Sequence, residues 1–424
     1  MAGSTLAEKI IARASGRTRV APGEIVTATV DLAMMHDSGG PRRVKPMLER
    51  LGVGVWDPAK VVLVSDHYVP AVDGESAAIL DLTRKWAVAN GIARFHDMQG
   101  ICHVILPERG YLAPGMFCVG GDSHSPTGGA FGAYMFGIGA TEMAGVLATG
   151  EIWIRTPRTH RIRLSGRLGH GLSAKDVMLH LCRTIGLSTV RYDAVEYSGD
   201  GVAGMPMVER MVLSNMSAEL GAQTGLIAPD AATVAFLRAA GAGIADDAID
   251  RWRSDADATY AADWDVDCGG LAPQIAAPHS PANADAADAH RGTRVDQAYI
   301  GACTGAKLSD LHMAAEILKG RRVAAGTRLL VAPASQRMTA AAAADGTLAT
   351  LMDAGAILLP SGCGACAGYG AGVLAEGETC LSSTARNFKG RMGHPGSRVY
   401  LGSPYSVAAA AVAGEIVDPR EFLA

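Results

Sequence analysis

Short apolar runs alternate with amphipathic stretches over the first third of the chain. Residues 60–64 have the composition of a buried strand, and residues 76–90 have apolar positions at helical spacing. Strands that alternate with helices of this length favour a parallel sheet with crossover helices. The pattern from residue 24 to about residue 155 therefore predicts an α/β fold.

A similar alternation returns further along the chain. A basic, strand-like segment spans residues 159–164, and a helix is expected at residues 173–185 with Ser173 as its N-cap. Residues 240–296 are rich in Ala, Asp, Pro and His and predict an irregular connector. Strands are then expected at 296–300, 327–332 and 355–359, and helices at 308–320 and 403–414. We predict three α/β domains: 1–158, 159–290 and 291–424.

Neither the most apolar stretch nor the N-terminal segment indicates a membrane span or an export signal. The most apolar stretch, residues 128–154, contains several glycines and Glu142, so we interpret it as a buried helix of a soluble core. Residues 1–17 form an amphipathic helical pattern without the apolar core of a signal peptide. Eight cysteines in 424 residues are too few for a disulfide scaffold. We therefore expect a reducing, cytoplasmic environment.

Composition adds limits on the partners. The chain has 38 Lys and Arg against 42 Asp and Glu, a formal net charge of −4, so neither nucleic acid nor an anionic membrane is an expected partner. Apolar residues make up 49% of the sequence, which indicates a folded protein. The 52 glycines predict many tight turns and close backbone approaches.

Three cysteines lie in glycine-rich turns that follow predicted strands. Cys363 and Cys366 form a C-x2-C pair, and Cys303 lies in a second such turn. Because the carboxyl ends of strands in α/β folds converge on one crevice, the three thiols are expected to meet. The other five cysteines are assigned to packing, with Cys102 the one nearest to a candidate site.

Several roles are open to these thiols. Each could be a small buried apolar group, and C-x2-C pairs also occur in zinc and thioredoxin-like sites. A closed zinc site needs a fourth ligand, which the neighbouring sequence does not offer, and no thioredoxin unit surrounds the pair. Three cysteines suit a cubane cluster with one iron left open as a Lewis acid.

Acids and imidazoles gather in the first predicted domain. Asp66-His67, His103 and Asp122-Ser123-His124 each follow an apolar run and precede turn residues. Loops at one sheet edge can bring such groups together for proton transfer, whereas a single histidine is most often a hydrogen-bonded loop residue. Three histidines beside candidate cluster ligands favour the catalytic interpretation.

With these motifs in their order and spacing, the sequence resembles the aconitase superfamily, in the branch of the 3-isopropylmalate dehydratase large subunits. The resemblance spans nearly the whole chain. It rests on Asp66-His67, on residues 120–129, 215–219, 273–281, 300–304 and 362–368, and on residues 386–393.

The resemblance implies three α/β domains around a central cleft that holds one [4Fe-4S] cluster. Its ligands would be Cys303, Cys363 and Cys366, and the open fourth iron would bind the substrate hydroxyl and carboxylate. By the same resemblance, catalysis would use Asp66, His67, His103, Asp122, Ser123, His124, Asn215 and Glu219, and the substrate carboxylate would be bound by Arg386 and Arg391. From the residues alone, both arginines could equally belong to a solvated basic stretch.

The implied reaction is the dehydration and rehydration of a malate-type 2-hydroxy diacid. The resemblance suggests 3-isopropylmalate, as in leucine biosynthesis, and leaves homoaconitase, 2,3-dimethylmalate dehydratase and maleate or citraconate hydratase as alternatives. Two positions depart from the usual pattern: Gly305 and Ala385 stand where asparagine is common. The segment from His36 to Gly40 also differs, so the choice of acid stays open.

The resemblance also implies a partner. Single-chain family members carry a C-terminal swivelling domain with a serine base and a further arginine, and the sequence ends at Ala424 without room for it. A separate small subunit is therefore expected, with the chain inactive alone. Two other classes are weaker: an Fe–S sensor that binds RNA lacks a dense basic stripe, and a partner that has lost catalysis conflicts with the complete set of candidate residues.

Overall fold

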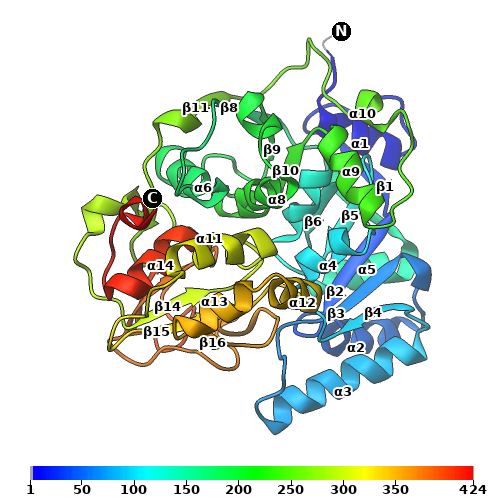
Figure 1. The fold of residues 1–424 in the computed structure, drawn as a ribbon. Helices are drawn as coiled ribbons and strands as arrows, with labels where there is room; N and C mark the ends of the chain where they lie inside the picture. Colours follow the sequence, from blue (N-terminus) through cyan, green and yellow to red (C-terminus); the bar gives the residue numbers. More distant parts are fainter. Residues whose placement is uncertain (1–2, 424) are drawn as a thin grey trace.

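The computed structural model describes residues 3–423 and confirms the predicted α/β fold (Figure 1). The first large sheet has the order β4–β3–β2–β5–β6 with every neighbouring pair parallel. Along the chain, the strands move outward from β2 to β4 on one side and from β5 to β6 on the other. The order in which strands are added therefore reverses between β2 and β5, and α/β folds bind their ligands at such a point. The strands are β2 (Leu32–His36), β3 (Val61–Ser65), β4 (Arg94–Asp97), β5 (Phe117–Gly120) and β6 (Tyr134–Gly137).

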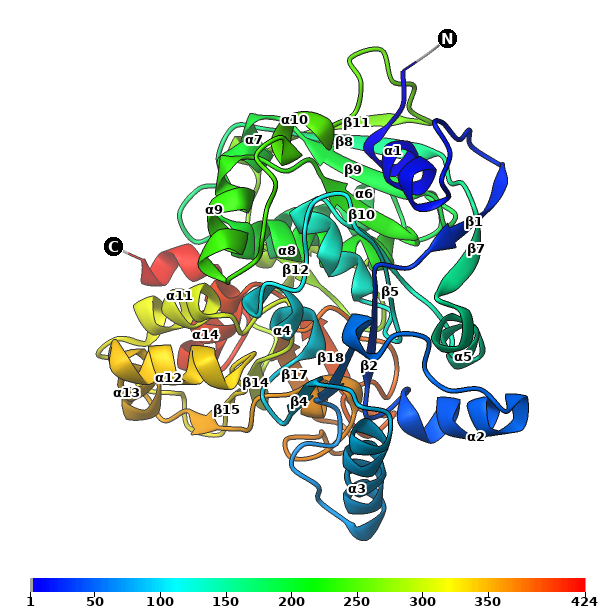
Figure 2. The ribbon, with the colours of Figure 1, turned by 90° about the vertical axis from the view of Figure 1, so that its right-hand side faces the viewer.

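Helices and a small ribbon complete this part of the molecule. The predicted helix at 76–90 is confirmed as α3 (Gly74–Ala89), and α1 (Leu6–Ala14) lies inside the predicted N-terminal helix. Two views show α3 and α2 at the margin of the molecule (Figures 1 and 2). The remaining elements are α2 (Pro41–Leu51), α4 (Cys102–Glu108), α5 (Ala140–Thr149), and the antiparallel pair β1 (Ile25–Thr29) and β7 (Glu151–Arg155).

The second sheet is also parallel, in the order β10–β9–β8–β11. Its predicted first strand is confirmed as β8, and the predicted helix that follows is confirmed as α6. The side chain of Ser173 accepts a hydrogen bond from the Lys175 amide, as expected for an N-cap. The elements are β8 (Thr159–Ser165), α6 (Ala174–Thr184), β9 (Ala194–Ser198), α7 (Asp200–Ala203), α8 (Met207–Met216), η3 (Ser217–Leu220), β10 (Thr224–Ile227), α9 (Ala231–Ala239), α10 (Ala248–Arg251) and β11 (Asp263–Asp267).

The third sheet has seven strands in the order β13–β12–β18–β17–β14–β15–β16. The five strands from β18 to β16 are parallel, and β12 and β13 add an antiparallel edge. In this sheet the order in which strands are added reverses between β14 and β17. The elements are β12 (Gln274–Ala276), β13 (Ala284–Ala286), β14 (Gln297–Ile300), α11 (Leu308–Leu318), β15 (Arg328–Val331), α12 (Gln336–Ala344), α13 (Thr347–Asp353), β16 (Ile357–Leu358), η6 (Gly364–Ala367), β17 (Thr379–Ser382), β18 (Arg398–Leu401) and α14 (Pro404–Ala413).

The interpretation of residues 128–154 as one buried helix is wrong. The segment contains the end of η2 (Ser125–Phe131), then β6, α5 and β7. Gly132 and Gly150 adopt φ of 71° and 75°, a left-handed conformation that ends a helical turn and that glycine reaches without steric strain. Within residues 3–423, none of the helices has the length and apolar character needed to cross a bilayer.

The prediction of an irregular connector at 240–296 is also wrong in part. It contains β11, β12 and β13. Strand β11 is acidic and mostly exposed, and its short alternation of Trp264 and Val266 with three aspartates was overlooked in an Asp-rich region. It pairs with the basic strand β8, where Arg161 Nε lies 2.5 Å from Asp263 Oδ1 and Arg163 Nε lies 2.7 Å from Asp265 Oδ1. Charge pairing with β8 therefore adds to the stability of this edge of the sheet.

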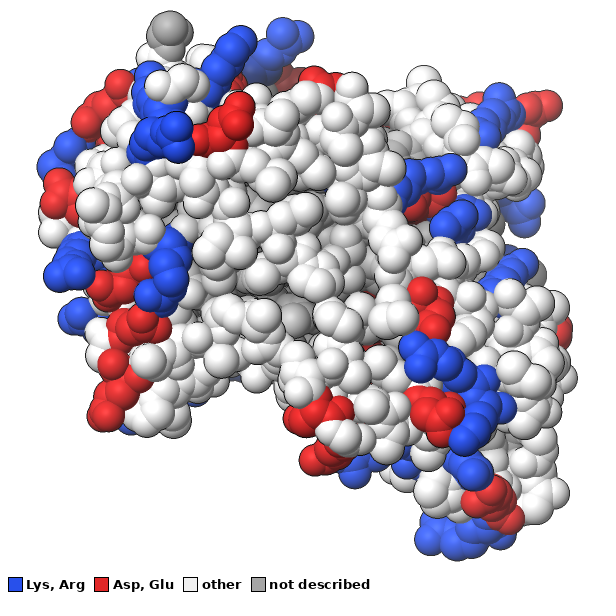
Figure 3. Space-filling model, turned by 60° about the horizontal axis from the view of Figure 1, so that its bottom comes forward, with Lys and Arg blue, Asp and Glu red and all other residues white. Residues whose placement is uncertain are grey.

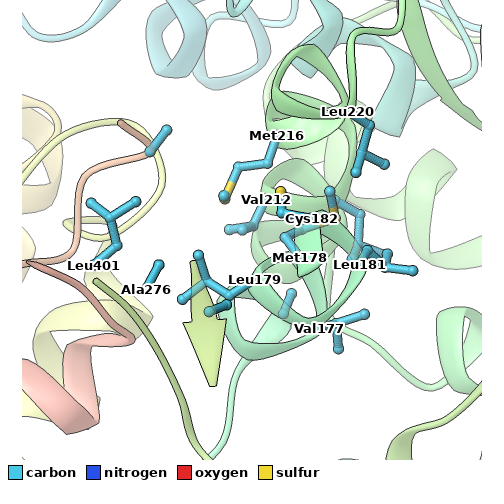
Figure 4. Packing of buried hydrophobic residues seen from close by; sticks show 14 of the residues in the cluster. Val177, Met178, Leu179, Leu181, Cys182, Val212, Met216, Leu220, Ala276 and Leu401 are labelled. Atoms are coloured by element: carbon cyan, nitrogen blue, oxygen red, sulfur yellow. The ribbon is translucent and has the colours of Figure 1, made fainter. Parts of the chain in front are cut away.

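One apolar cluster joins the second and third sheets. Figure 4 shows Leu179 of α6 pointing toward Ala276 of β12 and Leu401 of β18, and all three side chains are fully buried. Continuous burial of this kind holds two sheets in a fixed relation, because separating them would expose the cluster to water. The strands β12 and β13 lie before residue 290 in the sequence but pair with the third sheet. The domain boundaries at 158 and 290 remain predictions.

Candidate active site

The predicted site residues lie where parallel strands end. In the first sheet the strand ends carry acids and imidazoles, and in the third sheet they carry thiols and a guanidinium group. The two edges meet where the Cys363 amide donates a hydrogen bond of 2.7 Å to the Asp66 carbonyl. The residues at these ends are His36 on β2, Asp66 after β3, Asp122 after β5, Cys303 after β14, Cys363 after β16 and Arg386 after β17.

Asp66 and His67 form a buried pair. Asp66 Oδ1 lies 2.7 Å from His67 Nδ1, and Asp66 Oδ2 accepts the Cys102 amide at the start of α4. Burial raises the pKa of Asp66, but the charge of His67 outweighs it, so the carboxyl stays ionised. Burial lowers the pKa of His67, and the charge and hydrogen bond of Asp66 outweigh it and raise that pKa to about 9. His67 is therefore a protonated group within this buried pair.

Asp122 is shared by several imidazoles. Its Oδ1 lies 2.7 Å from His103 Nε2 and accepts the His124 amide at 2.8 Å, while Oδ2 lies 3.9 Å from His67 Nε2. Burial raises the pKa of Asp122, yet the charge and hydrogen bond of His103 bring it well below its ordinary value. His103 Nδ1 is buried without a partner among the described residues. An unpartnered imidazole nitrogen is a group to which a proton can be delivered or from which one can be taken.

Glu219 connects this network to a predicted substrate-binding arginine. Its Oε1 lies 3.0 Å from His124 Nε2 and 2.8 Å from Arg386 Nε. Arg386 Nη1 donates to Ser123 Oγ at 2.7 Å. Burial raises the pKa of Glu219, but the His124 hydrogen bond and the Arg386 charge outweigh it, so the carboxylate stays ionised. Both glutamate and serine therefore fix the guanidinium plane.

The three predicted cluster cysteines lie close to these groups. Cys303 and Cys366 are buried and Cys363 is half-buried, with its Sγ 3.9 Å from Asp66 Oδ2. The amide of Asn215 on α8 donates to Cys303 Sγ at 3.1 Å. The guanidinium group of Arg391 interacts electrostatically with the sulfur of Cys366, which raises the pKa of Arg391 against the effect of burial. Burial, with the charge of Cys366, raises the pKa of Cys303 to about 12, so metal binding would have to displace its proton.

The donor set fits an iron–sulfur cluster better than a single ion. Thiolates around one zinc would lie about 3.8 Å apart, given a Zn–S distance of about 2.3 Å. Within residues 3–423, no group of three ligand atoms that includes these cysteines lies within 4.8 Å. Soft thiols held further apart, with an amide and a guanidinium group beside the sulfurs, suit a larger iron–sulfur unit. Arg391 Nε is buried without a partner in the described chain and is one donor left for such a group.

The sequence predictions missed His36 and Asp37. The His36 ring stacks on His67 at a centroid distance of 4.1 Å, and its Nε2 lies 4.0 Å from Asp122 Oδ2. Asp37 Oδ1 accepts the His67 amide at 3.1 Å. The signal was present, because an acid beside a histidine directly after a buried apolar run also marks Asp66 and His67. Lys175 was missed too, since a lysine at a helix start is ordinarily exposed.

A cleft of about 360 Å³ opens beside these groups. Its lining includes Asp122, Ser123 and Arg386, so a small diacid has access to the network. A larger groove of about 730 Å³ lies between α2 and α3 and contains none of the predicted site residues. The smaller cleft is therefore the candidate active site, because it carries the groups that can bind a carboxylate and move a proton.

Sheets that present acids, imidazoles and buried thiols at one cleft define an enzyme of the aconitase class, and sequence comparison agrees. The chain belongs to the aconitase family (aconitate hydratase), whose profile matches residues 8–291 and 283–414. The resemblance seen in the motifs is thus confirmed.

Individual relatives cover the whole chain. The 3-isopropylmalate dehydratase large subunit 1 of Methanopyrus kandleri is 45% identical over 99% of this chain and 100% of its own length. The 3-isopropylmalate dehydratase large subunit of Moorella thermoacetica is 41% identical over 99% and 100%. The probable methanogen homoaconitase large subunit of Methanothermobacter thermautotrophicus is 41% identical over 98% and 97%. Among solved structures, aconitase X of Thermococcus kodakaraensis aligns with a TM-score of 0.49 at 11% identity, over 85% of this chain and 84% of that chain.

Proposed function

We propose that this chain is the large subunit of an iron–sulfur hydro-lyase that dehydrates and rehydrates a malate-type 2-hydroxy diacid, with 3-isopropylmalate as the first substrate. The observation that carries the proposal is the contact between the two sheet edges at Cys363 and Asp66. It sets a thiol suited to a cluster beside a His–Asp pair suited to proton transfer. Support comes from the full-length relatives named 3-isopropylmalate dehydratase large subunit.

Cys303, Cys363 and Cys366 would hold a [4Fe-4S] cluster. When bound, such a cluster with one open iron supplies a Lewis acid for the substrate's hydroxyl and carboxylate oxygens. The Asn215 amide lies 3.1 Å from Cys303 Sγ and would donate to that thiolate. A hydrogen bond of this kind orients the sulfur and stabilises its negative charge.

Arg386 would bind the substrate carboxylate. Its guanidinium group is held by Glu219 and Ser123, which leaves part of its fork of donors facing the cleft. Removing the proton alpha to a carboxylate builds negative charge on that carboxylate. A planar guanidinium group can donate two hydrogen bonds to that charge in a fixed orientation. Arg391, beside Cys366, would act at the cluster side of the cleft.

The His–Asp network would deliver a proton to the departing hydroxyl. His67 has its Nδ1 toward Asp66 and its Nε2 toward Asp122. His103 binds the same Asp122 through Nε2. Asp122 therefore hydrogen-bonds one imidazole and lies within ion-pair distance of the other, which holds both rings in position for proton delivery.

The proposal includes a partner and a compartment. The relatives that match end to end are named large subunits, which supports a small-subunit partner. That partner would carry a swivelling domain with a serine base and a further arginine. The eight cysteines are all free in the structure, which supports a reducing cytoplasm. On the face drawn in Figure 3, acidic and basic side chains are interspersed at the margins, and this mixture favours a small-molecule substrate over RNA.

The test combines spectroscopy with activity. The full chain is reconstituted anaerobically with iron and sulfide and then assayed, alone and with its small subunit, for the absorbance of the unsaturated intermediate. We expect brown iron–sulfur absorption, and turnover only with the small subunit. Homocitrate, 2,3-dimethylmalate, maleate and citraconate are assayed in parallel, since homoaconitase large subunits are among the relatives. Zinc bound stoichiometrically in place of iron, or full turnover by the chain alone, would contradict the proposal.

A further inference from the structure

Lys175 is buried at the junction of two active-site segments. It is the second residue of α6, and its side chain is 1% exposed. Its Nζ donates to the Ser383 carbonyl at 3.2 Å, to the Thr384 carbonyl, and more weakly to Thr304 Oγ1 at 3.5 Å. Thr304 follows the predicted ligand Cys303. Ser383 and Thr384 precede Arg386, so one ammonium group ties both segments to α6.

The charge of this ammonium group has no carboxylate partner. Across residues 3–423, the ion pairs within 4.0 Å include none with Lys175. Lys307 makes the contrast clear, because it is equally buried and pairs with Asp310 at 2.7 Å. The position at the N-terminus of α6 adds to the cost, since the helix dipole is positive at that end. A buried and unpaired cation is unfavourable unless an anion compensates it.

The anionic groups that can compensate Lys175 belong to the predicted cluster site. The groups whose negative charge favours the charged lysine are, in order, Cys303, Cys366, Glu219 and Cys182, and burial raises the pKa of Cys182 so that it stays a neutral thiol. Lys175 is also tied to the first of them through Thr304, the residue after Cys303. Glu219 is already engaged by His124 and Arg386. Cys303 and Cys366 are neutral thiols when protonated and become anionic when they bind iron. Whether the positive charge of Lys175 is compensated therefore depends on whether these cysteines are neutral thiols or iron-bound thiolates.

We infer that Lys175 is a positioning residue that supplies the positive counter-charge for thiolates at Cys303 and Cys366, and that its buried charge is compensated only when the cluster is bound. The inference rests on the proposed function, because it requires the cluster. Without the cluster, the ammonium group is an uncompensated buried charge. With the cluster, it stabilises the thiolates and the bound iron.

Two variants separate charge from hydrogen bonding. K175Q keeps a polar donor but removes the charge, and K175R keeps the charge. The full chain is prepared in each form without the cluster and after anaerobic reconstitution. Three quantities are measured: the thermal midpoint with and without the cluster, the rate of iron release to a chelator, and the midpoint potential in a dithionite titration followed by electron paramagnetic resonance.

We expect K175Q to release iron roughly tenfold faster than wild type, because the thiolates lose their counter-charge. Its cluster should be reduced at a more negative potential, since reduction adds an electron that the cation favours. The gain in thermal midpoint on cluster binding should shrink in K175Q and persist in K175R.

K175Q could instead lower the thermal midpoint equally with and without the cluster and leave the midpoint potential of the cluster unchanged. That result would show that Lys175 is only a structural support. A cluster-free K175Q chain that fails to fold while K175R folds would also overturn the inference, because the charge would then stabilise the empty site. A wild-type chain that binds no cluster would instead contradict the proposed function.

Discussion

Glu219 Oε1 lies 2.8 Å from Arg386 Nε and 3.0 Å from His124 Nε2, so a single carboxylate oxygen holds a guanidinium group and an imidazole together. Glu219 comes from η3 of the second sheet region, whereas Arg386 follows β17 of the third and His124 follows β5 of the first. This carboxylate therefore joins groups from all three parts of the chain at the cleft.

Arg386→Lys should lower kcat/KM by about 100-fold or more. Lysine keeps the positive charge but cannot contact Glu219, Ser123 and a substrate carboxylate with one rigid fork of donors. Steady-state kinetics with the small subunit present would measure the loss. Arg294→Lys is the matched control, because Arg294 is 79% exposed and should leave the rate unchanged. An Arg386→Lys enzyme with wild-type kinetics would remove Arg386 from the proposed substrate site.

Cys363→Ser should abolish the visible iron–sulfur absorption of the reconstituted chain. A serine hydroxyl is a poor replacement for a soft thiolate ligand, and two remaining cysteines are too few to hold the cluster. Absorption spectra and iron analysis after anaerobic reconstitution would measure the change. Cys268→Ser is the control, since Cys268 is buried at η4 (Cys268–Gly270), outside the cysteine site, and should leave the spectrum intact. Unchanged iron content in Cys363→Ser would contradict the ligand assignment.

Gly305→Ala should destabilise the chain by about 1–3 kcal/mol. A Cβ at position 305 would lie 2.3 Å from both Cβ and Oγ of Ser383 and 2.7 Å from its carbonyl oxygen. Ser383 thus occupies the space that a longer side chain at 305, such as asparagine, would need. Thermal or denaturant unfolding would measure the effect.

Gly145→Ala is the control for this prediction. Gly145 lies on the exposed face of α5, where an added methyl group would meet no other atom within 4 Å, and alanine is the better helix former by about 1 kcal/mol. We expect a neutral or stabilising effect there. Equal stability of the two variants would mean that Ser383 moves aside without penalty.

Glu209→Gln should remove a pH dependence of stability. Burial, with the charge of Asp310, raises the pKa of Glu209 from its ordinary value of 4.5 to about 7. Between these values the folded chain binds more protons than the unfolded chain, so the free energy of unfolding falls as the pH rises and levels off above about 7. The contribution of this one group is about 3 kcal/mol across that window.

Glutamine suits this site because Glu209 Oε2 accepts the Ala174 amide while Oε1 has no partner in the described chain. Thermal midpoints of wild type and Glu209→Gln measured from pH 5 to pH 8 would test the prediction. The thermal midpoint of Glu209→Gln should rise relative to that of wild type as the pH increases toward 8. Parallel curves for the two proteins would show that Glu209 titrates normally.

Much of the candidate site could be predicted because its residues follow buried strands directly. Asp66, Asp122 and Cys303 each come at the end of an apolar run, and parallel strands bring such ends to one edge. His36 follows the same rule and was missed only because its segment departs from the usual family pattern. Strand β11 was missed because its alternation of aspartates with Trp264 and Val266 is short and lies in an Asp-rich region. In the structure its aspartates pair with arginines of β8, 100 residues away in the sequence for Arg163 and Asp263.

By itself, the sequence determined the α/β class, the family and the chemical types at the cleft, because these depend on local periodicity and on residues in short motifs. Only the tertiary structure decided which groups touch. It placed Cys363 against Asp66, let Asp66 accept the first amide of α4, and buried Lys175 against Thr304 and the Ser383 carbonyl. Those contacts join residues more than 30 positions apart, and their geometry depends on how the sheets pack rather than on any local pattern.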